Sequence, residues 1–461
     1  MQINRQTPHV ESKLIEICRA PVPADLLARA RFTLLDWLGC IIAARHMPVA
    51  VSMARTQGIA PERLLHTAMS PSQVNGQTSA LILGTLGNVL EMDDLHRASI
   101  LHPGDVVCAA AFAVALRQQA SGAAVLSAIV QGYEMSVRIG KAAATGGYTP
   151  FYNSGTCGVF GAATAASALM KLDEVRMLDA LGQAGMQAAG VWQCRLEPTF
   201  SKQLACAHAA RAGVFAAELA QADFPGPKSI LTGQLGFFAS YYPAANHAPL
   251  NAHNDWALTE MSFKPFSACR HTHPAISAAL DLGWRGRAEE VHSIDIHTYG
   301  PALDFCDAVD PDTPEAARFS LQHAVAVALL KGVPAIGDFE GAALTDPAVA
   351  RLRRHTRLHV APDFDAAFPC AYGARVGLTL ANGSQFDAAC PAAWGDPENP
   401  MSPADLITKF RANAAYGGAA APAAELIVDA VLSLSDMDDM SALHTALTTA
   451  LSPEPELPDV A

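Results

Sequence analysis

Apolar positions recur at helical spacing through most of the first half of the chain. From Pro23 to about Tyr242, seven segments combine this spacing with residues of high helix propensity. They span residues 23–45, 78–92, 106–119, 122–143, 158–172, 173–190 and 207–222. Alanine and glycine dominate their faces, and small side chains let helices approach closely. We therefore predict a compact bundle in which several helices are fully buried.

The pattern changes after about residue 264. Residues 290–300 alternate like a strand, and residues 374–390 form two alternating runs around Asn-Gly-Ser, which predicts a hairpin. Residues 318–332 predict a helix, residues 347–364 are mixed, and residues 402–414 and 423–434 return to helix.

These patterns predict a mainly α fold, in which a large all-helical domain built from both chain ends accompanies a smaller α+β domain. We place the first part of the helical domain at 1–263, the α+β domain at 264–402 and the returning C-terminal helices at 403–461.

Composition and charge narrow the class of protein. The 461 residues carry a net charge of −13, which argues against nucleic acid and anionic membranes as partners, because both require a basic surface. No apolar run reaches the ~20 residues of a membrane-spanning helix, and the first residues show no basic-then-apolar signal pattern. The ten cysteines are scattered, with no Cys-x-x-Cys. We expect a cytoplasmic protein without a membrane or nucleic-acid partner.

The common catalytic signatures are missing from the sequence. No Gly-x-Gly-x-x-Gly follows a predicted strand, and neither Gly-x-Ser-x-Gly nor His-Glu-x-x-His occurs. Nucleotide cofactors, serine hydrolysis and zinc peptidase chemistry are therefore disfavoured.

Isolated polar clusters carry the remaining chemistry. In the stretch LEMDDLHRASILHPGDV, residues 90–106, Glu91 and Asp94 are three residues apart and are expected to share a helix face. His102 is expected at the start of the next helix, with Asp105 as an N-cap. A carboxylate near a histidine can set its tautomer, which suits general acid-base catalysis.

The alternative for this stretch is a polar turn held by capping and by salt bridges with Arg97. In either case we assign Asp93, Arg97 and Ser99 to capping or surface roles.

Three further clusters hold candidate site residues. Tyr148 and Tyr152 precede a helix expected to start near residue 155, where backbone N–H groups can hold a carboxylate. The other two clusters contain cationic side chains, which suggest a site for a small anionic ligand. The second of these clusters lies at the junction between the two predicted domains, where clefts form. They contain Lys202 and His208, and Lys264, Cys269, Arg270, His271 and His273. Their spacing fits no standard zinc pattern, so we expect no metal.

Together these stretches resemble the MmgE/PrpD family, which includes 2-methylcitrate dehydratases, cis-aconitate decarboxylases and an iminodisuccinate epimerase. The resemblance covers essentially the whole chain. Its strongest points are residues 91–107, 132–142, 155–163, 201–213, 263–276 and 315–332.

The resemblance implies an all-helical domain made from both chain ends, with a smaller α+β lid domain, usually in a homodimer. It also implies chemistry without metal or cofactor on small di- or tricarboxylates, at a site between the domains. The positions that match the family's functional residues are Glu91, Asp94, His102, Lys202, Lys264 and Cys269.

Three positions depart from the family pattern. Leu95 stands where many members have threonine, Tyr152 where the decarboxylases carry a catalytic histidine, and Ala205 where a histidine is frequent. These departures disfavour cis-aconitate decarboxylation.

The leading hypothesis is a cofactor-independent lyase, a dehydratase resembling 2-methylcitrate dehydratase. Its catalytic candidates are His102, Tyr152, Lys264 and Asp94, and its substrate-binding candidates are Lys202, Glu91, Cys269, Arg270, His208 and His273. One alternative is an epimerase of an aminopolycarboxylate with Tyr152 and Lys264 as two bases. A second alternative is a carboxylate-binding protein without catalysis.

Overall fold

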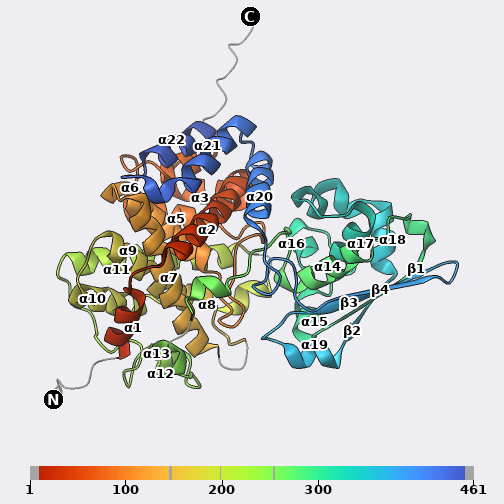
Figure 1. Cartoon of the computed structure of the whole chain (residues 1–461), viewed down its shortest axis with the longest axis horizontal. Helices are drawn as coiled ribbons and strands as arrows, with labels where there is room; N and C mark the ends of the chain where they lie inside the picture. The colour runs from red at the N-terminus through yellow and green to blue at the C-terminus, as the bar shows by residue number, and fades with distance from the viewer. Residues whose placement is uncertain (1–9, 145–147, 198, 253–254, 452–461) are drawn as a thin grey trace, which may run out of the picture. The chain divides into compact units, whose positions relative to one another are not determined.

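The computed structural model describes residues 10–144, 148–197, 199–252 and 255–451. Contacts within the chain divide it into two compact units. The first comprises residues up to Val89, Asp93–Met261 and residues from Pro403 onward, and the second comprises Leu90–Met92 and Ser262–Ser402. Figure 1 shows the first unit as helices from both ends of the chain and the second as a sheet with its own helices.

The first unit is all-helical. Its helices are α1 (Val10–Cys18), α2 (Ala24–Ala43), α3 (Pro48–Gln57), α4 (Leu64–Ala68), α5 (Gly76–Leu86), α6 (Ala109–Gln118), α7 (Gly122–Ala143), α8 (Asn153–Thr156), α9 (Gly158–Leu169), α10 (Glu174–Gly185), α11 (Ser201–Gln221), α12 (Phe237–Tyr241), α13 (Ala248–Asn251), α20 (Pro403–Tyr416), α21 (Ala421–Leu432) and α22 (Ser441–Leu451).

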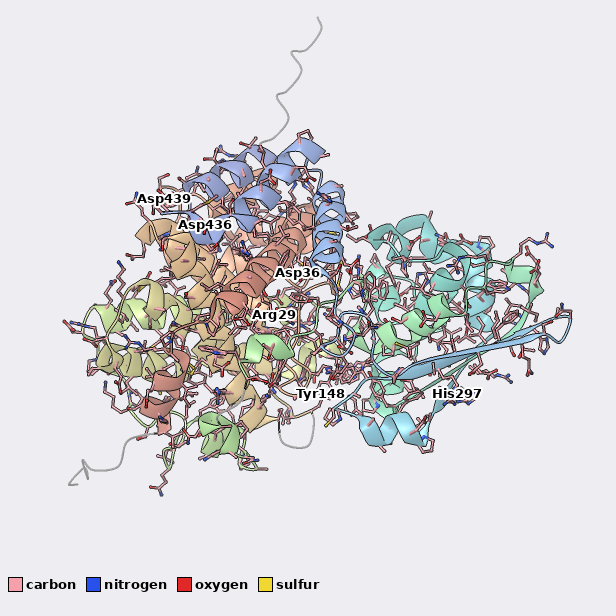
Figure 2. All side chains as sticks on the ribbon, viewed as in Figure 1. Arg29, Asp36, Tyr148, His297, Asp436 and Asp439 are labelled. Atoms are coloured by element: carbon pink, nitrogen blue, oxygen red, sulfur yellow. The ribbon has the colours of Figure 1, made fainter. Side chains whose placement is uncertain are left out.

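Small side chains form the centre of this unit, as the sequence predicts. Helix α11 packs on α5 and α9, and α7 packs on α9, with alanine filling most of the contact positions. The C-terminal helix α20 lies against α2, where Lys409 and Asp36 form a buried ion pair of 2.6 Å. Figure 2 labels Asp36 on α2. This contact joins the two chain ends in one core.

The second unit contains a four-stranded sheet in the order β2-β1-β3-β4. Strand β1 (Val291–Thr298) runs parallel to β2 (Thr356–Val360) and antiparallel to β3 (Ala374–Leu380), which forms a hairpin with β4 (Gln385–Cys390). In register, Ile294 faces Thr356 on one side and Leu378 on the other. The prediction of a hairpin from Asn-Gly-Ser is therefore confirmed. Strand β2 lies within residues 347–364, for which the pattern predicted neither a helix nor a strand.

Helices cover one face of this sheet and leave the other polar. The helices of the unit are α14 (His273–Asp281), α15 (Gly300–Cys306), α16 (Pro314–Arg318), α17 (Leu321–Lys331), α18 (Pro347–Arg354) and α19 (Pro362–Ala367). Helix α14 packs on β3 and β4. On the polar face, Asp295 pairs with Arg357 and His359, and the His359 ring stacks on His297, which Figure 2 labels. The fold is thus mainly α with a small α+β part, as predicted.

Among the described residues, no single helix is both long and apolar enough to cross a bilayer, although the sharply bent pair spanning Ala24–His46 and Pro48–Gln57 passes the same test of length and composition.

Candidate active site

The polar stretch after α5 is irregular and supplies residues to both units. Helix α5 ends at Leu86, and regular structure resumes only with a π-helical turn at Gly104–Cys108. Glu91 has a left-handed backbone conformation with φ 53°, and Ser267 holds the carbonyl of Leu90 in the second unit through a 2.7 Å hydrogen bond. Glu91 and Asp94 therefore do not share a helix face, and this prediction is wrong.

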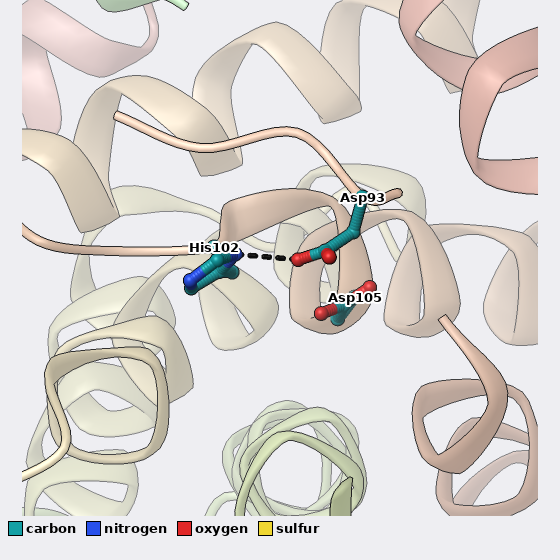
Figure 3. Close-up of side chains that lie close together, drawn as sticks. All are labelled: Asp93, His102 and Asp105. Carbon is teal, nitrogen blue, oxygen red and sulfur yellow. Dashed lines mark ion pairs between the residues drawn. The ribbon is translucent and has the colours of Figure 1, made fainter. Parts of the chain in front are cut away.

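Asp93 is the carboxylate partner of His102. Its carboxylate and the imidazole form an ion pair, which Figure 3 marks with a dashed line. Oδ2 of Asp93 lies 2.5 Å from Nδ1 of His102, and only 3% of the Asp93 side chain and 14% of the His102 side chain are exposed. The assignment of Asp93, Arg97 and Ser99 to surface roles is wrong, because all three are buried. A carboxylate on Nδ1 fixes the tautomer in which Nε2 carries the lone pair.

Asp94 has a different partner. Tyr133 on α7 donates a 2.7 Å hydrogen bond to its Oδ2, and the backbone N–H of Gly104 donates to Oδ1 at 3.0 Å. Burial raises the pKa of Asp94 to about 7, and the charges of Asp36 and Asp93 act in the same direction. The two hydrogen bonds oppose this rise only in part.

Asp105 lies within the π-helical turn rather than at an N-cap. The cap position of this turn is Pro103, which accepts no side-chain hydrogen bond, and Asp105 is fully buried. One carboxylate oxygen of Asp105, one of Asp93 and a ring nitrogen of His102 lie within 4.8 Å of one another. The N-cap prediction is wrong, and the turn instead brings a second carboxylate toward the imidazole (Figure 3).

These three side chains have the donor types of a divalent cation site. However, two neighbouring ligands of an octahedral ion lie about 2.9 Å apart when each is about 2.1 Å from the ion. The ion pair between Asp93 and His102, with its two atoms 2.5 Å apart, is closer than this separation. The arrangement is therefore a carboxylate-imidazole pair.

Tyr152 lies beside this pair and is fully buried. Its ring centroid is 6.5 Å from that of His102 and 4.5 Å from that of Trp192, and its Oη is 3.5 Å from Sγ of Cys206. Burial raises the pKa of Tyr152 well above its ordinary value, and the neighbouring Cys206 adds to the rise. Tyr152 is therefore a neutral hydrogen-bonding group near pH 7, not a base.

Lys202 brings a positive charge to the same group of side chains. It lies in the first turn of α11, one helical turn before Cys206, and is half-buried. Burial raises the pKa of Cys206, and the Lys202 charge opposes this effect. His208, two residues after Cys206 on α11, has its Nε2 3.0 Å from the carbonyl oxygen of Gln187. The structure thus places Lys202 beside Cys206 and gives His208 a structural contact.

The second unit holds a separate buried pair. Nζ of Lys264, which is fully buried, lies 3.4 Å from Oε2 of Glu91. Cys269 lies near both charges. Burial alone raises the pKa of its thiol, but hydrogen bonds from Cys306 and the backbone of His271, together with the Lys264 charge, bring it below the ordinary value.

Arg270 and His273 have partners inside the second unit. Arg270 forms a buried ion pair with Asp396, whose Oδ1 also accepts a 2.6 Å hydrogen bond from Ser262. His273 has its Nε2 3.0 Å from the carbonyl of Ala268. A guanidinium that is already neutralised is a weaker ligand for a substrate carboxylate, so these contacts favour structural roles.

The structure therefore gathers the candidates into two groups. His102, Tyr152 and Lys202 lie in the helical unit, whereas Glu91, Lys264 and Cys269 lie in the α+β unit. Sequence reasoning did not identify the site neighbours Asp93, Asp105, Cys206 and Trp192. The one sequence signal for them was the second acidic residue, Asp93, directly before Asp94. The π-helical turn that carries Asp105 and the backbone hydrogen bond from Tyr152 to Gly190 have no sequence signature.

The chain thus combines an all-helical unit with an α+β unit, and the helical unit contains a buried carboxylate-imidazole pair. Two family models match the chain: the MmgE/PrpD N-terminal domain at residues 14–249 and the MmgE/PrpD C-terminal domain at residues 266–434. The chain therefore belongs to the MmgE/PrpD family, and the resemblance inferred from the sequence is confirmed.

Several relatives align over most of the chain. Cis-aconitate decarboxylase of Homo sapiens is 28% identical over 393 residues, which cover 82% of this chain and 80% of that protein. The cis-aconitate decarboxylase-like protein oryM of Aspergillus oryzae is 26% identical over 469 residues, or 95% of this chain and 96% of that protein. Cis-aconitate decarboxylase of Aspergillus terreus is 24% identical over 453 residues, or 92% and 91%.

Proposed function

We propose that this protein is a lyase that acts on a tricarboxylate, with His102 as the group that moves the proton. The observation that carries the proposal is the 2.5 Å contact between Nδ1 of His102 and Oδ2 of Asp93. A histidine oriented by a buried carboxylate is a common arrangement of a general base.

A dehydration requires a proton to leave a carbon next to a carboxylate, where negative charge then develops. Nε2 of His102 would take this proton, and Asp93 would stabilise the resulting imidazolium. Lys202 would bind a substrate carboxylate and stabilise the developing charge. In a dehydration, the C–O bond then breaks and the imidazolium returns its proton to the leaving hydroxide as water.

The names of the three relatives support a tricarboxylate substrate and a lyase reaction. Two reactions fit the same proton carrier. Dehydration of a hydroxylated tricarboxylate is favoured by Tyr152, a neutral phenol at the position where the decarboxylases carry a catalytic histidine. Decarboxylation is favoured by the relatives themselves. In that case the bond to a carboxylate carbon breaks, carbon dioxide leaves, and the carbanion takes a proton from the imidazolium.

The two-base epimerase has less support. Its first base would be Tyr152, and burial keeps that phenol protonated near neutral pH. None of the three relatives described above is named as an epimerase.

The test is incubation of the full chain with cis-aconitate and with a panel of citrate-like hydroxy acids. Alkene absorbance reports dehydration or its reverse, and ¹³C NMR detects released carbon dioxide. We expect turnover of at least one tricarboxylate, and a kcat lowered about 10²- to 10⁴-fold in His102→Gln and in Asp93→Asn.

The matched control is His96→Gln, which changes a buried histidine that contacts Ser99 and Glu260 instead. We expect this variant to lose stability and to keep its kcat. Tricarboxylate binding without turnover in the folded wild-type chain would overturn the lyase proposal and support a non-catalytic binding protein.

A further inference from the structure

Asp105 is a buried carboxylate in the helical unit that the proposed reaction does not use. It is fully buried and lies on the π-helical turn Gly104–Cys108, three residues after His102. π-helical turns are rare and occur frequently at functional sites. The extra residue in such a turn changes the direction of the side chains that follow, so Asp105 faces the cluster rather than capping a helix.

The Asp105 carboxylate packs closely against Gly87. A Cβ atom added to Gly87, at the end of α5, would lie 2.0 Å from Oδ1 of Asp105 and 2.8 Å from its Cγ. The absent side chain of Gly87 is therefore the space that the carboxylate occupies. Gly87 caps the end of α5, whereas Asp93 lies further along, in the irregular segment.

We propose that Asp105 is a positioning residue for the proton-transfer histidine: its carboxylate is a second anion beside His102 and stabilises the imidazolium form. This inference rests on the proposed function for its effect on rate. It is carried by the geometry in Figure 3, where oxygens of Asp93 and Asp105 and a ring nitrogen of His102 lie within 4.8 Å of one another.

The physical effect of a second carboxylate is direct. An opposite charge within about 4–6 Å favours the charged form of a titratable group and shifts its pKa by about 1 to 3 units. A base that must remove a carbon-bound proton gains from higher basicity as long as it stays unprotonated at the working pH. The titratable groups that the contacts place at His102 are Asp93 from the loop, Asp105 from the π-helical turn and the ring of Tyr152 before α8. Behind Tyr152 lies Cys206 on α11, on which the Lys202 charge acts.

The test compares the wild-type chain with Asp105→Asn, which keeps the shape of the side chain and removes its charge. The His102 ring is followed by ¹⁵N NMR of histidine-labelled protein, with the signal assigned by its loss in His102→Gln. We expect the titration midpoint of His102 to fall by about 1 pH unit, because the imidazolium loses a neighbouring anion. In assays, we expect kcat to fall about 10-fold, KM to stay within about 2-fold, and the acidic limb of the kcat profile to move to lower pH.

Two further variants separate positioning from stability. Gly87→Ala should displace the Asp105 carboxylate and lower the His102 midpoint in the same direction. Glu134→Gln removes another buried carboxylate of this unit, one that pairs with Arg138, and should leave the midpoint unchanged.

The NMR readout distinguishes this proposal from the lyase proposal. A lowered midpoint in a protein without turnover would support the positioning role and overturn only the proposed function. A His102 midpoint within about 0.2 units of wild type in folded Asp105→Asn would overturn the positioning role, whatever the activity.

Discussion

The backbone N–H of Gly104 donates a 3.0 Å hydrogen bond to Oδ1 of Asp94, and the absent side chain of Gly104 leaves the space in which that carboxylate lies. A Cβ atom at this position would lie 2.7 Å from Oδ1 of Asp94 and 3.0 Å from Oη of Tyr133. Both neighbours are buried and hydrogen-bonded to each other, so neither can move without losing its partner.

Gly104→Ala should therefore destabilise the helical unit. Overpacking of a filled core costs about 1–3 kcal/mol, and displacement of the Asp94 carboxylate adds to this cost. Urea unfolding gives the free energy. The matched control is Gly337→Ala, where an added Cβ has no heavy atom within 4 Å and the expected change is within about 0.5 kcal/mol. Equal stability of the two variants would contradict the tight packing around Gly104.

Asp94 should make the stability of the protein depend on pH. Its pKa in the folded state is about 7, above the ordinary value of 3.8, so the folded state binds the proton more tightly than the unfolded state. The contribution is fully present below about pH 4 and is lost as the pH rises through about 7, at roughly 1.4 kcal/mol per pH unit. Asp94→Asn cannot titrate and lacks this dependence.

The measurement is the free energy of unfolding of wild type and Asp94→Asn at pH 5 and pH 7.5. Wild type should lose a few kcal/mol relative to the variant between the two pH values. A difference between the two proteins that does not change with pH would contradict the raised pKa of Asp94.

Tyr152→Phe should change catalysis only modestly. The phenol is fully buried and stays protonated, so its contribution is a neutral hydrogen bond with Cys206 of about 1 kcal/mol. We expect kcat/KM on the best tricarboxylate to fall less than about 10-fold, with no displacement of the pH profile. A loss above 10³-fold would instead make Tyr152 a proton-transfer group, and the two-base epimerase would then need testing by solvent deuterium exchange.

Local sequence pattern encodes the regular helices and the hairpin of this protein, whereas tertiary contacts decide its irregular segments. The buried helices were predictable because their composition is continuous over many residues, and the β3–β4 hairpin was predictable from its turn. The segment predicted as a helix over 78–92 ends at Leu86, because groups beyond it bind distant partners. Tyr133 donates to the carboxylate of Asp94, and Ser267 donates to the backbone carbonyl of Leu90.

The same cause explains the error between two adjacent aspartates. Asp93 and Asp94 are chemically identical neighbours, and one pairs with His102 while the other accepts from Tyr133 on α7. In an irregular segment neither periodicity nor spacing tells which carboxylate faces which partner. The π-helical turn that directs Asp105 toward His102 is equally invisible in the sequence.

Arg270 should prove to be a structural residue of the α+β unit. Its guanidinium pairs with Asp396, and both side chains are buried. Removal of one partner from a buried ion pair costs about 3–5 kcal/mol, because the other charge is left without compensation. Arg270→Met should therefore lower the unfolding midpoint strongly. The double variant Arg270→Met with Asp396→Asn should recover part of this loss, because it removes both charges and keeps an oxygen that accepts the hydrogen bond of Ser262. In the folded double variant, KM for the tricarboxylate should stay within about 3-fold of wild type. A KM raised more than about 30-fold in that variant, at unchanged stability, would return Arg270 to the substrate-binding role that the sequence suggested.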